Sequence, residues 1–331
     1  MIIVRTPTRV SFCGGGSDLP VFYEKHGGAV LSASLSRYVY LSIHPYFHQN
    51  EIICKYSKTE LVNKPSKLKH PILRVLLEQF NIRGVEVVCT ADIPAGTGLG
   101  SSSSFTVALL HTLYAYTGKY VSAMSLAEEA CYTEINLLGE PIGKQDQYAA
   151  AFGGLNVFRF KKDGSVEVDP VIMSSEALER MERNLLMFYT GNMRSASQIL
   201  EKQVRNVVCD IEKEKVQIEI CKLTDELHKE LIKDNIDALG PILHAGWVQK
   251  RKLADGITNQ LIDEAYEAAL AAGASGGKLL GAGGGGFLLF YVPEHKHDAV
   301  KNAMSHLKYI EFGLSRNGSS VIYIGEKPKG R

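Results

Sequence analysis

A stretch rich in glycine and serine, PAGTGLGSSSS at positions 94–104, constrains the fold of this chain more than any other feature. It follows the apolar run VEVVCTADI and precedes SSSFTVALLHTLYAYTG, whose apolar residues recur at helical spacing, so the local order is strand, loop, helix. The first N–H groups of a helix lack partners within it, and the helix dipole adds about half a positive charge there. The sequence therefore predicts a site for an anion, above all phosphate.

The residue types of this loop agree with phosphate binding. Gly96, Gly98 and Gly100 would let the backbone approach a phosphate without a Cβ clash, and the serines at 101–104 offer hydroxyls to the helix cap, to phosphate oxygens or to a metal. A flexible turn with a capping serine is the simpler alternative, but one serine would satisfy it. The loop lacks the Lys-Ser or Lys-Thr pair of a Walker A motif, which argues against a P-loop NTPase.

Two more glycine-rich segments stand far from this loop in the sequence. KLLGAGGGGFLLFYV contains a G-x-G-x-x-G match that begins at Gly281, but these glycines precede a predicted strand, whereas a dinucleotide fingerprint follows one into a helix. RTPTRVSFCGGGSD places Asp18 on a tight turn downstream of Arg5 and Arg9. Asp18 could be an ordinary turn residue that bonds its own backbone, or a functional carboxylate.

Composition and charge restrict the partners and the compartment. Of the 331 residues, 45% are hydrophobic and 22% charged, which is ordinary for one or two globular domains. The net charge of +1 gives no sign of a nucleic-acid-binding face. The six cysteines form no CxxC pair, and we find neither a signal peptide nor an apolar run long enough for a membrane span. We expect a cytoplasmic protein with reduced thiols, no nucleic-acid partner and no membrane association.

The three glycine-rich segments, in this order and at these separations, resemble the three motifs of the GHMP kinases, which include galactokinase, homoserine kinase, mevalonate kinase and phosphomevalonate kinase. PTRVSFCGGGSD is similar to the first motif, PAGTGLGSSSS to the second, P-x-G-x-G-L-G-S-S, and KLLGAGGGGFLLF to the third. The resemblance extends from Arg5 to about Phe290. It implies an α/β (α+β) chain of two domains with the active site between them.

The resemblance also implies the fold of each domain. Residues 1–182 would form an N-terminal ATP-binding domain like ribosomal S5 domain 2, and residues 183–331 a ferredoxin-like C-terminal domain. In the second domain we expect NLLMFYTG, FLLFYV and SVIYIG as antiparallel strands beneath helices. The division is drawn where strand-rich segments give way to mostly helical ones.

In this family the phosphates of ATP lie on the second motif, and Mg²⁺ takes a hydroxyl from its serines and a carboxylate from a later helix. The hydroxyl would come from Ser103 or Ser102. Family spacing favours Glu134 over Glu128 and Glu129 as the carboxylate, in keeping with the one or two carboxylates that Mg²⁺ commonly uses beside phosphate oxygens. Without the resemblance, Glu134 would be interpreted as a surface charge. The implied ATP contacts are Pro94, Gly96, Thr97, Gly98, Leu99, Gly100, Ser101, Ser102 and Ser103.

GEPIGKQDQYAAAFGG resembles the G-x-x-D-Q segment of the galactokinase branch and implies that Asp146 is the catalytic aspartate. An aspartate there could accept the proton of the acceptor hydroxyl and direct its oxygen at the γ-phosphorus. A helix cap is the alternative. Arg9 matches the arginine that pairs with this aspartate, where its charge would keep Asp146 ionised and face the transferring phosphoryl group.

Asp18 matches the aspartate with which galactokinases bind sugar hydroxyls, but the usual G-E-H-T-D is G-G-G-S-D here, which argues against galactose. Segments such as YSKTE, HPILR and FYTGNMRSASQIL instead resemble the D-glycero-D-manno-heptose 7-phosphate kinase branch. These enzymes phosphorylate the anomeric hydroxyl to give a 1,7-bisphosphate, on the route to nucleotide-activated heptose for bacterial surface polysaccharide. The implied partner is a small sugar phosphate.

A phosphorylated acceptor requires cations besides those that serve ATP. Lys144 and Arg194 are the expected ones and Arg74 is a further candidate, although each could be an exposed ion-pair residue. The acceptor contacts expected in all are Gly15, Gly16, Ser17, Asp18, Lys144, Arg194, Gly283 and Gly284.

Three alternatives stay open at this point. The chain could be a kinase for fucose, mannose or galactose, a sugar- and nucleotide-binding regulator without catalysis, or an ATP-dependent decarboxylase of the same superfamily. The presence of Asp146, Glu134 and Arg9 favours an active enzyme over a regulator. The sequence leaves the oligomeric state as monomer or homodimer.

Overall fold

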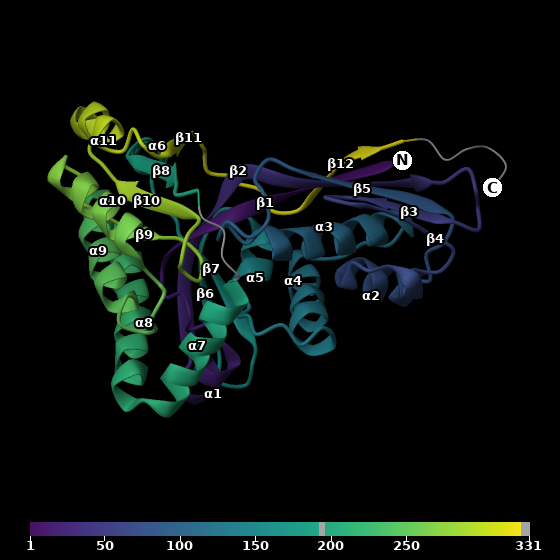
Figure 1. The fold of residues 1–331 in the computed structure, drawn as a ribbon, viewed down its shortest axis with the longest axis horizontal. Coiled ribbons are helices and arrows are strands. Elements are labelled where there is room, and N and C mark those ends of the chain that lie inside the picture. Colours follow the sequence, from purple (N-terminus) through teal and green to yellow (C-terminus); the bar gives the residue numbers. More distant parts are fainter. Residues whose placement is uncertain (192–195, 326–331) are drawn as a thin grey trace.

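The computed structural model describes residues 1–191 and 196–325, with the backbone alone at 196–198. Within them the strands form an eight-stranded and a four-stranded sheet, and helices pack on both (Figure 1). This mixed α/β arrangement confirms the expected fold class. The larger sheet contains β1 (Ile2–Cys13), β2 (Gly28–Pro45), β3 (Ile52–Lys55), β4 (Thr59–Val62), β5 (Val85–Ala91), β6 (Leu155–Phe160), β7 (Val166–Pro170) and β12 (Ser320–Ile324).

The long strand β2 organises the larger sheet because its two halves have different neighbours. Its first half pairs with β6 and its second half with β5, while β1 runs antiparallel along both. Burial follows the same division, because β2 is continuously buried from Ala29 to Leu35 and alternates from Val39 to Ile43. The first half is therefore covered on both faces and the second half on one.

Helices cover that one face along the second half of the sheet (Figure 1). Their apolar side chains share one core with the strands, in which Leu41, Val107 and Ala150 are almost fully buried. The central helix of the group, at Ser101–Tyr116, is buried around most of its circumference, which accounts for its nearly continuous apolar sequence. The helices are α2 (Pro71–Gln79), α3 (Ser101–Tyr116), α4 (Ala123–Cys131), which continues as a π-helix (Tyr132–Leu137), and α5 (Gln145–Phe152).

In the smaller sheet β8 (Leu185–Tyr189) and β10 (Phe287–Tyr291) are central, with β11 (Lys308–Ile310) and β9 (Gly276–Leu279) at the edges, and every pair is antiparallel. Met187 and Leu289 enter a core shared with β1 and β2, which joins the two sheets. Phe188 and Phe290 face the opposite core. The remaining helices are α1 (Pro20–His26), α6 (Ser175–Arg183), α7 (Ala196–Cys209), α8 (Ile211–Leu231), α9 (Leu239–Lys250), α10 (Gln260–Ala271), α11 (His297–Ala303) and 3₁₀ turns at Pro65–Lys67, Ile236–Ala238 and Glu294–Lys296.

The expectation that SVIYIG belongs to the second sheet is wrong. This segment is β12, which pairs antiparallel with β1 of the larger sheet, from Ile2↔Ile324 to Arg5↔Ser320. An alternating pattern indicates a strand but not the sheet edge that the strand joins, and here the chain crosses back after β11 (Figure 1). Among the described helices, none is both long and apolar enough to cross a membrane.

Candidate active site

The glycine- and serine-rich loop ends where α3 begins, as the sequence predicts. Gly96, Gly98 and Gly100 have φ values of 77°, 86° and 72°, a conformation that favours glycine. Gly98 also packs against the third glycine-rich segment, because a Cβ on Gly98 would lie 2.8 Å from the carbonyl oxygen of Leu280 and one on Gly281 would lie 2.5 Å from Cα of Gly98. The two segments are in direct backbone contact.

Two pockets share a wall at this contact. We call one the loop pocket, because it is lined by the loop glycines, Ser101 to Ser103, His70 and Glu134. The other is the turn pocket, lined by the Gly14–Gly16 turn, Asp18, Gln145 and Gln203. The shared wall consists of Arg9, Ile142, Asp146, Gly281 and Ala282.

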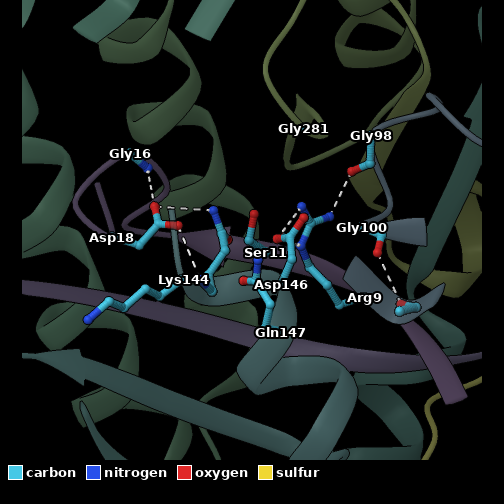
Figure 2. A network of polar contacts seen from close by, with 12 residues as sticks. Arg9, Ser11, Gly16, Asp18, Gly98, Gly100, Lys144, Asp146, Gln147 and Gly281 are labelled. Atoms are coloured by element: carbon cyan, nitrogen blue, oxygen red, sulfur yellow. Dashed lines mark hydrogen bonds and ion pairs between the residues drawn. The ribbon is translucent and has the colours of Figure 1, made fainter. Parts of the chain in front are cut away.

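An ion pair between Arg9 and Asp146 stands on the shared wall. Nε and Nη2 of Arg9 lie 2.7 Å and 2.6 Å from Oδ1 of Asp146, and Nη1 of Arg9 donates to the carbonyl of Gly98 at 2.7 Å. Arg9 is 5% exposed, whereas the side chain of Asp146 keeps 24% of its surface. The arginine therefore fixes the carboxylate against the loop and leaves part of it accessible. Figure 2 shows the pair midway between Asp18 and Gly98.

Asp18 lies in the turn pocket on the other side of Asp146 (Figure 2). Its Oδ1 accepts from the N–H of Gly16 at 3.0 Å, and Oδ2 accepts from the N–H of Gln145 at 3.2 Å. Burial raises the pKa of Asp18, and the charge of Asp146 raises it further. Gly143 must be glycine here, because a Cβ would lie 1.9 Å from Oδ2 of Asp18. The turn is thus built around this carboxyl group.

Glu134 is a carboxylate buried beside the loop serines. The π-helix that carries it widens the helical turn and places its side chain inward, at 2% exposure. Oε1 accepts from the hydroxyl of Thr106 at 3.0 Å and Oε2 from Nε2 of Gln147 at 2.6 Å, and the hydroxyl of Ser103 donates as well. Burial raises the pKa of Glu134 to about 7.

The surroundings of Glu134 fit a magnesium ion bound together with a nucleotide. None of the ion pairs formed among residues 1–191 and 196–325 involves Glu134, so its carboxylate has no cationic partner within that part of the chain. No group of three His, Cys, Asp or Glu side chains that could hold a metal alone occurs in the described part of the chain. A cation beside Glu134 and Ser103 would therefore need phosphate oxygens as further ligands, which is how Mg²⁺ is commonly bound.

Two of the three cations considered for the acceptor phosphate donate to backbone carbonyls elsewhere in the structure. Nζ of Lys144 donates to the carbonyl of Gly164 at 2.6 Å and lies 4.8 Å from the ring centre of Tyr23, so the side chain points away from the turn pocket (Figure 2). Arg194 lies outside the described residues. Nη1 of Arg74 donates to the carbonyl of Leu68.

The remaining predicted residues divide between pocket and scaffold. Gly15 and Gly16 line the turn pocket, whereas the hydroxyl of Ser17 donates to the carbonyl of Ala29. In the third segment, Gly281 and Ala282 line both pockets. Other predicted residues make contacts within the protein scaffold. Gly283 and Gly284 contact Ile257, and the hydroxyl of Thr97 donates to the carbonyl of Pro94. Leu99 is buried.

The sequence interpretation missed the lysines and glutamines of the turn pocket. Lys278 and Lys250 line it beside Gln203 and Gln145. Lys278 opens the third motif in KLLGAGGGG, which is a signal that could have identified it. Lys250 stands in the charged run QKRK, which is typical of an exposed helix end, so no local pattern marks it.

Comparisons with known proteins agree with this geometry. Residues 66–154 match the family described as GHMP kinases N terminal domain, and residues 227–310 match GHMP kinases C terminal. The chain is 26% identical to the D-glycero-alpha-D-manno-heptose 7-phosphate kinase of Campylobacter jejuni, over 96% of this chain and 97% of that protein. It is 30% identical to the mevalonate kinase of Pyrococcus abyssi, over 71% of this chain and 68% of that one.

A solved structure extends the likeness in fold to almost the whole chain. The crystal structure of a D-glycero-D-manno-heptose 1-phosphate kinase from Bacteroides thetaiotaomicron superposes with a TM-score of 0.81. The match covers 98% of this chain and all of that one, at 24% sequence identity.

Proposed function

Because this chain belongs to the GHMP kinases, which transfer phosphate from ATP to alcohols, we propose that it is a sugar 1-kinase acting on D-glycero-D-manno-heptose 7-phosphate. The acceptor would be phosphorylated at its anomeric hydroxyl, and the resulting 1,7-bisphosphate would serve the synthesis of nucleotide-activated heptose. The near full-length similarity to a heptose 7-phosphate kinase supports this choice of acceptor.

The proposal depends on one observation: the Arg9–Asp146 pair stands on the wall that the two pockets share. ATP in the loop pocket would direct its terminal phosphate at this wall, with its phosphates on the N–H groups at the start of α3. A sugar in the turn pocket would meet Asp146 from the other side. Asp146 would accept the proton of the hydroxyl and orient its oxygen for in-line attack.

Each remaining group has a role in this scheme. Arg9 positions Asp146 against the loop through its bond to the carbonyl of Gly98. Ser103 and Glu134 would hold Mg²⁺, which neutralises charge on the phosphates when bound. Asp18, held by Gly16 and Gln145, would fix sugar hydroxyls near Asp146.

Turnover with a panel of acceptors tests the proposal. The purified protein would be given ATP and Mg²⁺ with heptose 7-phosphate, sedoheptulose 7-phosphate, mannose, fucose or galactose, and ADP would be measured. We expect heptose 7-phosphate to give the highest kcat/KM and the product to carry a phosphate on the anomeric carbon. A better unphosphorylated sugar would overturn the choice of acceptor. Binding of nucleotide and sugar without any product would instead identify a catalytically silent regulator.

A further inference from the structure

Two lysines line the turn pocket on the side of the third glycine-rich segment. Lys278, on β9, is 7% exposed and donates to the carbonyls of Ser11 and Phe12 at 2.8 Å and 3.0 Å. Lys250, at the end of α9, is half-buried, and its Nζ donates to the carbonyl of Gly281 on the shared wall. With that bond made, two N–H groups of the Lys250 ammonium remain for a ligand.

Cationic side chains outnumber carboxylates among the described residues that line the turn pocket. Its described cations are Arg9, Lys250 and Lys278, and its described carboxylates are Asp18 and Asp146. Asp146 is engaged by Arg9, and neither lysine forms an ion pair within the described residues. Burial, with the charges of Lys278 and Arg9, holds the pKa of Lys250 well below its usual value, and burial lowers the pKa of Lys278 to about 8. An anion bound here would relieve this unfavourable arrangement.

The position of Lys250 within the turn pocket indicates which anion would bind to it. Gly281, to which its ammonium is bonded, is in backbone contact with Gly98 of the phosphate loop. Lys250 therefore lies at the end of the turn pocket that adjoins the loop pocket. Gly16 and Asp18 lie toward the other end (Figure 2). There Gln203 donates to Gln217, and Gln217 donates to the carbonyl of Gly15.

We propose that Lys250 is a catalytic residue whose ammonium binds the phosphoryl group as it passes from ATP to the acceptor. This rests on the proposed kinase function. In the step, the bond between the γ-phosphorus and the bridging oxygen of ATP breaks, a bond to the acceptor oxygen forms, and the hydroxyl proton passes to Asp146. Lys250 stabilises the oxygens of the transferred group from the acceptor side, and Lys278 adds positive charge behind it.

The alternative source of the anion is the phosphate that the acceptor already carries, and kinetics separate the two. We would compare Lys250→Met with the wild type on heptose 7-phosphate and on the same heptose without phosphate. Removing a group that stabilises the transition state should lower kcat about 100-fold on both acceptors, with the KM for ATP nearly unchanged. A loss confined to the phosphorylated acceptor would assign Lys250 to the resident phosphate and overturn the proposal.

Controls distinguish catalysis from a structural role. Lys252→Met removes an exposed lysine of the same segment, whose Nζ bonds Gln249, and should leave kcat unchanged. Lys250→Arg keeps a cation and should recover at least about tenfold of the rate lost in Lys250→Met. If both Lys250 variants unfold at the wild-type temperature, bind ATP normally and still turn over at the wild-type rate, the proposal is wrong.

A separate measurement tests phosphate binding by Lys250 without turnover, so that a failure of the proposed function can be distinguished from a failure of this inference. Inorganic phosphate binding would then be measured by calorimetry in the presence of ADP and Mg²⁺. Lys250→Met should weaken phosphate binding at least about tenfold relative to Lys252→Met. Equal phosphate affinity in the two variants would overturn the inference.

Discussion

At the scale of single residues, Asp146 should contribute to the chemical step and little to nucleotide binding. Asp146→Asn keeps the shape of the side chain but cannot take the hydroxyl proton. We expect kcat to fall by about 10²–10⁴-fold, while the affinity for a non-hydrolysable ATP analogue, measured by calorimetry, changes less than about threefold. Asp169→Asn, which removes the ion pair with Arg159 on the β6–β7 hairpin, is the control and should keep full activity. A kcat of Asp146→Asn within tenfold of wild type would contradict the role.

Individual residues also show where sequence interpretation succeeds. Arg9 and Asp146 are 137 positions apart, yet the motifs predicted their pairing, and the structure contains it. Lys144 lies two residues before Asp146 in the same segment, but its ammonium bonds to Gly164. The direction of a long side chain depends on neighbours that its own segment does not contain. The sequence interpretation missed Lys250 because its ammonium reaches the pocket only through the packing of α9 against the third glycine-rich segment, which is distant in the sequence.

At the scale of elements, the two ends of α3 provide a test of how the phosphate loop is built. Gly100 and Gly118 both have φ of 72°, so alanine at either position should cost about 1–2 kcal/mol in unfolding free energy. They differ in surroundings: a Cβ on Gly118 meets nothing within 4 Å, whereas one on Gly100 would lie 3.0 Å from Oδ2 of Asp146. Gly100→Ala should therefore lower kcat at least about tenfold and Gly118→Ala should not. Urea unfolding and steady-state kinetics on both variants would decide, and equal kcat values would contradict the role of Gly100.

The elements near the site were predicted to different depths. The glycine-rich loop and the apolar periodicity that follows it located α3, because both depend on local sequence. The segment that carries Glu134 was predicted as a regular helix, but α4 continues as a π-helix. The wider helical turn directs Glu134 toward Thr106 and Gln147. Local sequence could not predict this, because Thr106 lies on α3 and Gln147 on α5.

At the scale of the whole molecule, the sequence predicted two mixed units but not how the chain returns between them. One polar contact at this return, which we call the anchor, joins three elements: the hydroxyl of Ser319, just before β12, lies 2.8 Å from both the hydroxyl of Thr6 on β1 and Nδ1 of His111 on α3. Thr6 and His111 are separated from Ser319 by more than 200 positions, and no sequence pattern links the three. Such long-range pairing is set by the packing of the whole fold.

This anchor should make global stability depend on pH. Burial lowers the pKa of His111, so the unfolded chain binds a proton at a higher pH than the folded protein does. The stability that neutral His111 confers is fully present above pH about 6.5 and declines as the pH falls below that value. Urea unfolding at pH 7.5, 6.5 and 5.5 should show a smaller loss of unfolding free energy for His111→Gln than for wild type, because glutamine can bond to Ser319 but does not titrate.

The comparison of the two proteins also controls for a second histidine. The pKa of His70 is lowered by burial, but His70 is present in both proteins, so the difference between them isolates His111. Equal losses in the two proteins would show that protonation of His111 does not weaken the anchor.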